Sequence, residues 1–192
     1  MTKQSDYKNY SVWLEGNNPA PIQHRDRLFS AYYRRNYMPL MPQDRRSRVL
    51  EIACGKGQFL DFLRSEGYTD VRAIDLDADN VADCKAKGLK AEQADMFKFI
   101  PALDEGSLDL VVMNDIIEHI AREDAAELLL IIRDKLANTG MLMVKTCNCN
   151  SIYGLSTFYS DFTHLVGYTP QKMKHLSILS GYGSCCSHNV YF

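Results

Sequence analysis

Residues 49–63 read VLEIACGKGQFLDFL, and this stretch decides the fold. The run from Arg48 to Cys54 is largely apolar and is typical of a buried strand. Gly55-Lys56-Gly57 then forms a turn, and the periodic segment at about residues 58–66 predicts a helix that stops at Gly67. Strand, glycine turn and helix in this order are the first unit of a parallel α/β sheet.

The alternation of strands and helices continues on both sides of this unit. We expect helices at about residues 25–38, 78–87, 123–136 and 170–181, strands at about 70–75, 89–94, 108–113, 141–145 and 185–191, and a long loop at about 147–168. The fold class is therefore α/β, a Rossmann-like, doubly wound and mostly parallel sheet with helices on both faces. We expect one domain over residues 1–192, with 1–46 as a helical, basic N-terminal extension.

Composition and charge exclude several classes of protein. With 46% hydrophobic and 24% charged residues, the chain is neither disordered nor fibrous. The net charge is −2, which argues against nucleic acid as a partner, although residues 1–48 carry nine basic and four acidic side chains. The longest uninterrupted apolar run is Leu128 to Ile132, and the first ten residues do not resemble a signal peptide. We therefore expect no membrane span and a cytoplasmic location.

The cysteine spacing argues against structural zinc. Six cysteines are present, and no two of them form a Cys-x-x-Cys pair. In a chain without an export signal the simplest interpretation is six reduced thiols. We expect no metal centre.

The position of one carboxylate indicates which ligand the glycine turn binds. Asp75 ends the second strand 20 residues after Gly55, where it can accept hydrogen bonds from the hydroxyls of an adenosine ribose. NAD and S-adenosylmethionine both contain this ribose. The dinucleotide pattern has a third glycine where this chain has Leu60, so S-adenosylmethionine is the expected cofactor.

These motifs resemble those of class I S-adenosylmethionine-dependent methyltransferases, over about Arg25 to Gly181. The family's first motif, E/D-x-G-x-G-x-G, is present as EIACGKG, with alanine in place of one glycine. The motifs AIDLD, QADMF and LDLVVMNDIIEHI follow in the family's order. The resemblance implies these cofactor-binding residues: Arg34, Glu51, Ala53, Gly55, Gly57, Asp75, Asp95, Met96 and Asn114.

A second resemblance concerns the methyl acceptor. DNA is a poor candidate, because Asn114-Asp115-Ile116-Ile117 lacks the two prolines of base amino-methylases. Asp161-Phe162-Thr163-His164, followed by Tyr168-Thr169-Pro170, is similar to the D-x-T-H and "fT" pattern of bacterial methyltransferases associated with polysaccharide biosynthesis, of the type 11/23 kind. This resemblance implies a sugar or a sugar-containing precursor as the acceptor.

A hydroxyl acceptor requires a base, and histidine suits this role near neutral pH. His164 is the first candidate, with Asp161 as its orienting group, and His119 is the second. Tyr153, Phe158 and Tyr159 are candidates for an aromatic wall against the acceptor.

The sequence predicts an O-methyltransferase acting on a sugar hydroxyl. Two alternatives remain: a small-molecule O-methyltransferase of the quinone or polyketide type, and an inactive S-adenosylmethionine-binding module. Methyltransferases of this type usually close with two further strands, and the eleven residues after Gly181 leave room for one. We expect either a truncated chain or an incomplete sheet with an exposed edge, through which two copies can form a homodimer.

Overall fold

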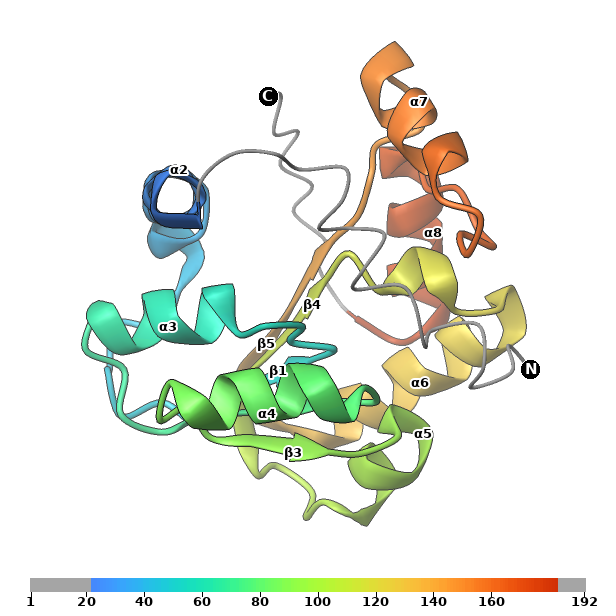
Figure 1. The fold of residues 1–192 in the computed structure, drawn as a ribbon. Helices are drawn as coiled ribbons and strands as arrows, with labels where there is room; N and C mark the ends of the chain where they lie inside the picture. Colours follow the sequence, from blue (N-terminus) through green and yellow to red (C-terminus); the bar gives the residue numbers. More distant parts are fainter. Residues whose placement is uncertain (1–21, 183–192) are drawn as a thin grey trace.

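The computed structural model describes residues 22–182, in which five parallel strands form one sheet with helices on both faces (Figure 1). The strand order is β3-β2-β1-β4-β5, so the order reverses between β1 and β4. This arrangement confirms the predicted Rossmann-like class. The elements are α2 (Ile22–Asn36), η2 (Met38–Leu40), β1 (Val49–Ile52), α3 (Gln58–Ser65), β2 (Val71–Asp75), α4 (Ala78–Ala86), β3 (Ala91–Gln93), α5 (Met96–Phe99), η3 (Ile100–Ala102), β4 (Leu108–Asn114), η4 (Ile117–His119), α6 (Arg122–Lys135), β5 (Leu136–Lys145), α7 (Ile152–Ser160) and α8 (Pro170–Leu179).

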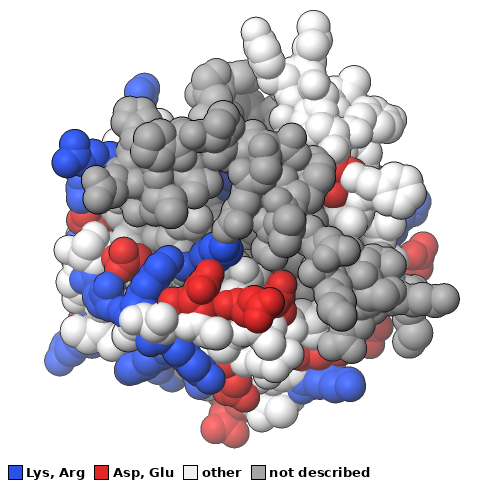
Figure 2. Space-filling view, viewed as in Figure 1, with Lys and Arg blue, Asp and Glu red and all other residues white. Residues whose placement is uncertain are grey.

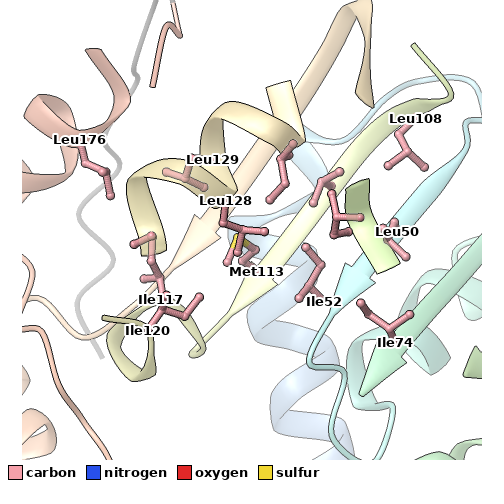
Figure 3. Packing of buried hydrophobic residues seen from close by; sticks show 14 of the residues in the cluster. Leu50, Ile52, Ile74, Leu108, Met113, Ile117, Ile120, Leu128, Leu129 and Leu176 are labelled. Carbon is pink, nitrogen blue, oxygen red and sulfur yellow. The ribbon is translucent and has the colours of Figure 1, made fainter. Parts of the chain in front are cut away.

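The sheet divides the core into two layers. Leu50 and Ile52 of β1 point into a cluster that also contains side chains of α6, η4 and α8 (Figure 3). Val49 points to the opposite face, where α2 and α3 cover the sheet and the rings of Tyr33 and Phe59 lie 4.9 Å apart. Both faces of the central strands are therefore buried, as their largely apolar sequences predict.

The strand register brings the carboxyl ends of the strands to one edge. Ile52, the last residue of β1, pairs with Ile74 of β2 and with Met113 of β4. The loops after these three strands consequently start side by side. In a doubly wound sheet this edge, where the strand order reverses, is where ligands bind.

Two boundaries differ from the prediction. The strand expected at about 141–145 already begins at Leu136, directly after α6 ends at Lys135. Leu136 pairs with Leu108 whereas Met141 pairs with Leu110, so an irregularity in the ladder accommodates residues 137–140.

The predicted loop at 147–168 also contains helix α7, which begins after Ser151. The Ser151 hydroxyl accepts a 2.9 Å hydrogen bond from the Gly154 amide and so caps the helix. The next helix, α8, begins as predicted, with the Thr169 hydroxyl accepting a hydrogen bond from the Lys172 amide.

The described residues include four of the six cysteines, and Cys54, Cys84, Cys147 and Cys149 are all free thiols. Cys185, Cys186 and the strand expected at 185–191 lie outside the described residues. Within residues 22–182, no helix has the length and apolar character needed to cross a membrane.

Candidate active site

Of the two glycines in the turn after β1, one has free space beside its Cα atom. Gly55 and Gly57 both have positive φ angles, of 52° and 77°. A Cβ atom added to Gly55 would meet nothing within 4 Å, whereas one added to Gly57 would lie 2.8 Å from the Cys84 Sγ and from a Leu89 methyl carbon. Gly55 therefore leaves room for a ligand against the backbone, and Gly57 lets the turn pack on α4 and the segment before β3.

Two residues beside this turn are held in the left-handed region without being glycine. Ala53, the departure from the family motif, has a φ of 57°, and Asp115 has a φ of 50°. Each follows the carboxyl end of a central strand, β1 and β4 respectively. Left-handed backbone costs a non-glycine residue roughly 1–2 kcal/mol, and such strain is concentrated at functional sites.

Asp75 ties the end of β2 to the glycine turn. Its Oδ2 accepts a 2.7 Å hydrogen bond from the Gly55 amide, and its Oδ1 accepts one of 2.9 Å from the Asp77 amide. The side chain is buried, and burial raises its pKa. Asn80 Nδ2 also donates to Oδ1, at 3.4 Å. A carboxylate has about four acceptor positions, so these three bonds leave capacity for a ligand hydroxyl.

A buried hydrogen-bonded chain lies between β1 and β4. The Tyr37 hydroxyl donates to Asn114 Oδ1 at 2.6 Å, and Asn114 Nδ2 donates to Glu51 Oε1 at 3.0 Å. Glu51 is fully buried, and burial raises its pKa to about 8. Its second oxygen, Oε2, is buried without a hydrogen-bond partner among the described residues. An unsatisfied buried oxygen beside the glycine turn fits a site that a polar ligand completes.

The other predicted cofactor residues divide into two groups. Asp95 and Met96 follow β3 at the same edge of the sheet, where the Asp95 carboxylate caps α5 by accepting from the Phe97 amide at 3.0 Å. Arg34 is not brought to the glycine turn. Its guanidinium forms an ion pair with Glu66 at the opposite end of α3.

The predicted catalytic residues lie on η4 and on the turn that follows α7. The Leu165 and Val166 amides donate to the Glu118 carbonyl at 2.7 and 3.1 Å. These bonds hold the Asp161–His164 turn against His119, so the structure brings together all three predicted catalytic residues although 44 positions separate His119 from Thr163.

The hydrogen bonds within this cluster differ from the predicted ones. Asp161 Oδ2 lies 3.8 Å from His164 Nε2, too far for a hydrogen bond, and His164 Nδ1 instead donates to the Phe158 carbonyl at 2.8 Å. Asp161 Oδ1 accepts a 2.6 Å bond from the Thr163 hydroxyl, which lies 2.9 Å from His119 Nδ1. The carboxylate thus contacts His119 through Thr163.

The environment of His119 favours its neutral form. The side chain is buried, and burial, followed by the neighbouring His164, lowers its pKa. The two imidazole rings meet edge to face with centroids 4.6 Å apart. A buried neutral imidazole near pH 7 is chemically suited to accept a proton.

The same three side chains are the candidates for holding a metal among the described residues. One ligand atom of His119, Asp161 and His164 each lies within 4.8 Å of the others. The hydrogen bonds through Thr163 and to the Phe158 carbonyl already account for how the rings are held.

The aromatic residues of α7 face in different directions. Phe158 packs inward and stacks on the His164 ring, with centroids 5.3 Å apart. Tyr153 and Tyr159 are exposed, and so is Phe162 in the following turn. Figure 2 shows this end of the molecule, where α7 projects in Figure 1, as largely uncharged.

Sequence reasoning missed three residues of the site. Tyr37 reaches it from the end of α2, Thr163 bridges two predicted catalytic residues, and Lys145 forms an ion pair with Asp115 across the ends of β4 and β5. Thr163 lies inside the D-x-T-H pattern and could have been identified from it. Tyr37 and Lys145 lie in no motif.

Comparisons with known proteins agree with this architecture. No curated protein matches the chain. A solved S-adenosylmethionine-dependent methyltransferase from Archaeoglobus fulgidus is 29% identical, with a TM-score of 0.73 over 81% of this chain and 68% of its own. One from Mesorhizobium loti is 20% identical, with a TM-score of 0.61 over 74% of this chain and 77% of its own.

A protein from Pyrococcus horikoshii shares the fold with 18% identity and a TM-score of 0.65, over 92% of this chain and 89% of its own. These likenesses confirm a class I methyltransferase fold and support S-adenosylmethionine as the cofactor. The family model described as methionine biosynthesis protein MetW matches residues 38–139, just over half of the 192 residues. By this match, the chain belongs to the MetW family.

Proposed function

We propose that the protein is an S-adenosylmethionine-dependent O-methyltransferase that acts on a hydroxyl of a sugar or a sugar-containing precursor. The observation that carries the proposal is the docking of the Asp161–His164 turn on His119, at the edge of the sheet that also holds the glycine turn. This docking supports the proposal, because it brings two histidines together at that edge, and an acceptor hydroxyl needs a base of this kind to take its proton.

The donor side of the site fits S-adenosylmethionine. When bound, this cofactor supplies a methyl group on a positively charged sulfur. We expect Asp75 to accept hydrogen bonds from the ribose hydroxyls, Gly55 to allow close approach of the backbone, and Asp95 and Met96 to border the adenine. Glu51, which is buried, and Asn114, which donates to it, lie where we expect the methionine end. Arg34 remains a candidate for the cofactor carboxylate only if its ion pair with Glu66 opens.

The acceptor side provides a route for the proton. As the acceptor oxygen bonds to the methyl carbon, the carbon–sulfur bond breaks and its electron pair passes to sulfur. The hydroxyl proton passes to an imidazole nitrogen of the His119–His164 pair and later to solvent. Alignment of the acceptor and removal of its proton are the two tasks that the chain's own residues must perform.

A sugar acceptor is supported by the D-x-T-H pattern and by the exposed rings near it. Tyr153, Tyr159 and Phe162 lie on α7 and the turn that follows, in the segment that leads to His164. Aromatic side chains with a few fixed polar groups are typical of small-molecule sites.

A product assay tests the proposal. The full chain is incubated with donor labelled in the methyl group and with three sets of acceptors: sugars, nucleotide sugars and phenols. We expect label in a sugar-containing product, and much less label with His119→Ala or His164→Ala at unchanged donor affinity. Label in phenols alone would instead show a small-molecule enzyme of the quinone or polyketide type. Donor binding without transfer to any acceptor would show an inactive binding module.

A further inference from the structure

The Thr163 hydroxyl links His119 to Asp161 and fixes the direction of both hydrogen bonds. A hydroxyl carries one proton, and an ionised carboxylate can only accept. The 2.6 Å bond to Asp161 Oδ1 therefore uses the Thr163 proton. In the 2.9 Å contact with His119 Nδ1, Thr163 must then be the acceptor, so Nδ1 carries the proton of the neutral imidazole. In that tautomer the basic nitrogen is Nε2.

Asp161 is in turn held in place by its own turn. The same oxygen, Oδ1, also accepts a 2.8 Å hydrogen bond from the Thr163 amide. Asp161 and Thr163 are thus joined by two hydrogen bonds, one from the main chain and one from the side chain. This arrangement sets the position of the Thr163 hydroxyl independently of His119.

His164 is constrained in a different way. Its Nδ1 donates to the Phe158 carbonyl, its ring stacks on Phe158, and its edge packs against His119. It therefore supports the His119 ring from the side, while Thr163 holds the Nδ1 atom.

We propose that His119 is the base for the acceptor hydroxyl and that Thr163, itself oriented by Asp161, is the positioning residue that selects its reactive tautomer. This inference rests on the proposed function and states which atom takes the proton of the acceptor hydroxyl. His119 Nε2 takes the acceptor proton as the new oxygen–carbon bond forms, and the resulting imidazolium donates from Nδ1 to Thr163 until Nε2 returns the proton to solvent.

The charged and titratable groups around His119 come from three places in the chain. Asp161 and His164 face it from the turn after α7, and Asp115 acts from the end of β4. Glu118 is its neighbour in η4 and is buried. Because the Thr163 hydroxyl accepts from Nδ1, it stabilises the imidazolium, and its removal should move the acid limb of the rate profile to lower pH.

Two substitutions of Thr163 and one control separate this role from packing. Thr163→Val keeps the shape and removes the hydroxyl, whereas Thr163→Ser keeps the hydroxyl. Thr157→Val is the matched control, because Thr157 is an exposed threonine whose hydroxyl donates at 2.9 Å to the Tyr153 carbonyl of its own helix. Unfolding curves of all three variants show whether each one folds.

The first measurement does not depend on activity. Long-range ¹H–¹⁵N spectra of protein labelled in histidine report the tautomer of His119, with the resonances assigned by their loss in His119→Gln. We expect the tautomer protonated on Nδ1 in the parent chain, in Thr163→Ser and in Thr157→Val, and a mixture in Thr163→Val. An unchanged tautomer in folded Thr163→Val would overturn the proposal.

The second measurement is kinetic and uses the acceptor found in the product assay. We expect Thr163→Val to lower kcat by about 10²-fold, the scale of a lost general base, at unchanged KM for the donor. Thr163→Ser should recover most of this loss. A kcat within twofold of the parent chain for folded Thr163→Val would contradict the assignment. If no acceptor is methylated, the proposed function fails, while the tautomer result still decides the role of Thr163.

Discussion

Tyr37 and Asn114 are 77 positions apart and are joined by a 2.6 Å hydrogen bond that connects the end of α2 to the end of β4. Through Asn114 the same bond extends to Glu51 of β1. One buried hydroxyl therefore links the segment before the sheet to its two central strands, at the edge where the candidate cofactor site lies.

Removing this hydroxyl should destabilise the protein. In Tyr37→Phe the ring stays in place, but Asn114 Oδ1 loses its donor in a part-buried position. We expect the free energy of unfolding in urea to fall by about 1–3 kcal/mol. Tyr153→Phe is the control, because Tyr153 is exposed on α7 and its change should stay within about 0.5 kcal/mol. Equal effects of the two substitutions would mean that the Tyr37 bond adds nothing.

Glu51 should make stability depend on pH. Its pKa is about 8 in the folded protein, against 4.5 as the ordinary value, because burial disfavours the charged form. Between these values only the folded state keeps the proton. The resulting stabilisation is complete below about pH 4.5 and is lost as the pH rises through 8.

Glu51→Gln tests this dependence, because glutamine stays neutral and still offers an oxygen to Asn114 Nδ2. We compare the unfolding free energy of the variant and of the parent chain in urea at pH 5 and at pH 8. We expect the difference, variant minus parent, to be larger at pH 8 than at pH 5 by at least about 1 kcal/mol. Glu118, whose pKa burial raises to about 6, acts in the same direction but is present in both proteins. Parallel curves for the two proteins would contradict the burial of a protonated Glu51.

Asp75 should contribute to donor affinity. Asp75→Ala removes the carboxylate that we assign to the ribose, and we expect the affinity for S-adenosylmethionine, measured by calorimetry, to weaken by about 1.5–3 kcal/mol. Asp77→Ala is the control. Asp77 caps α4 through the Asp79 amide at 2.8 Å, so its loss should lower stability by about 0.5–2 kcal/mol and leave the affinity unchanged. If Asp75→Ala binds as tightly as the parent chain, the ribose lies elsewhere.

The two glycines of the turn should respond differently to a methyl group. Both substitutions place alanine in left-handed backbone, but only Gly57→Ala also pushes a Cβ against Cys84 and Leu89. We expect Gly57→Ala to lose about 2–4 kcal/mol of unfolding free energy from strain and overpacking together. Gly55→Ala should lose less stability and more donor affinity. The reverse ranking in urea unfolding and calorimetry would place the ligand on the other side of the turn.

The fold could be predicted from local signals. The apolar run of β1, the glycine turn and the position of Asp75 are each encoded within a few residues, and the structure places them as expected. Helix α7 was missed because its sequence, IYGLSTFYS, contains a glycine and exposes large apolar side chains, so it shows no pattern of one buried face.

The pairings within the site could not be predicted, because they depend on how distant segments dock. Nothing near Tyr37 indicates that its hydroxyl meets Asn114. Asp161 and His164 are close in sequence, yet the carboxylate bonds to Thr163 instead, because the main chain of the turn directs it there. Spacing shows which residues are neighbours but does not show which atoms make the bonds.

The hydrogen bonds from the Leu165 and Val166 amides to the Glu118 carbonyl determine which property of the protein a substitution would affect. The residues that we assign to the methyl donor all lie at or before Asn114. Those that we assign to the acceptor depend on the segment around Asp161–His164, which docks from further along the chain. A substitution confined to that segment would leave a protein that still binds its methyl donor but does not transfer the methyl group. Donor binding and methyl transfer could therefore be lost independently of each other.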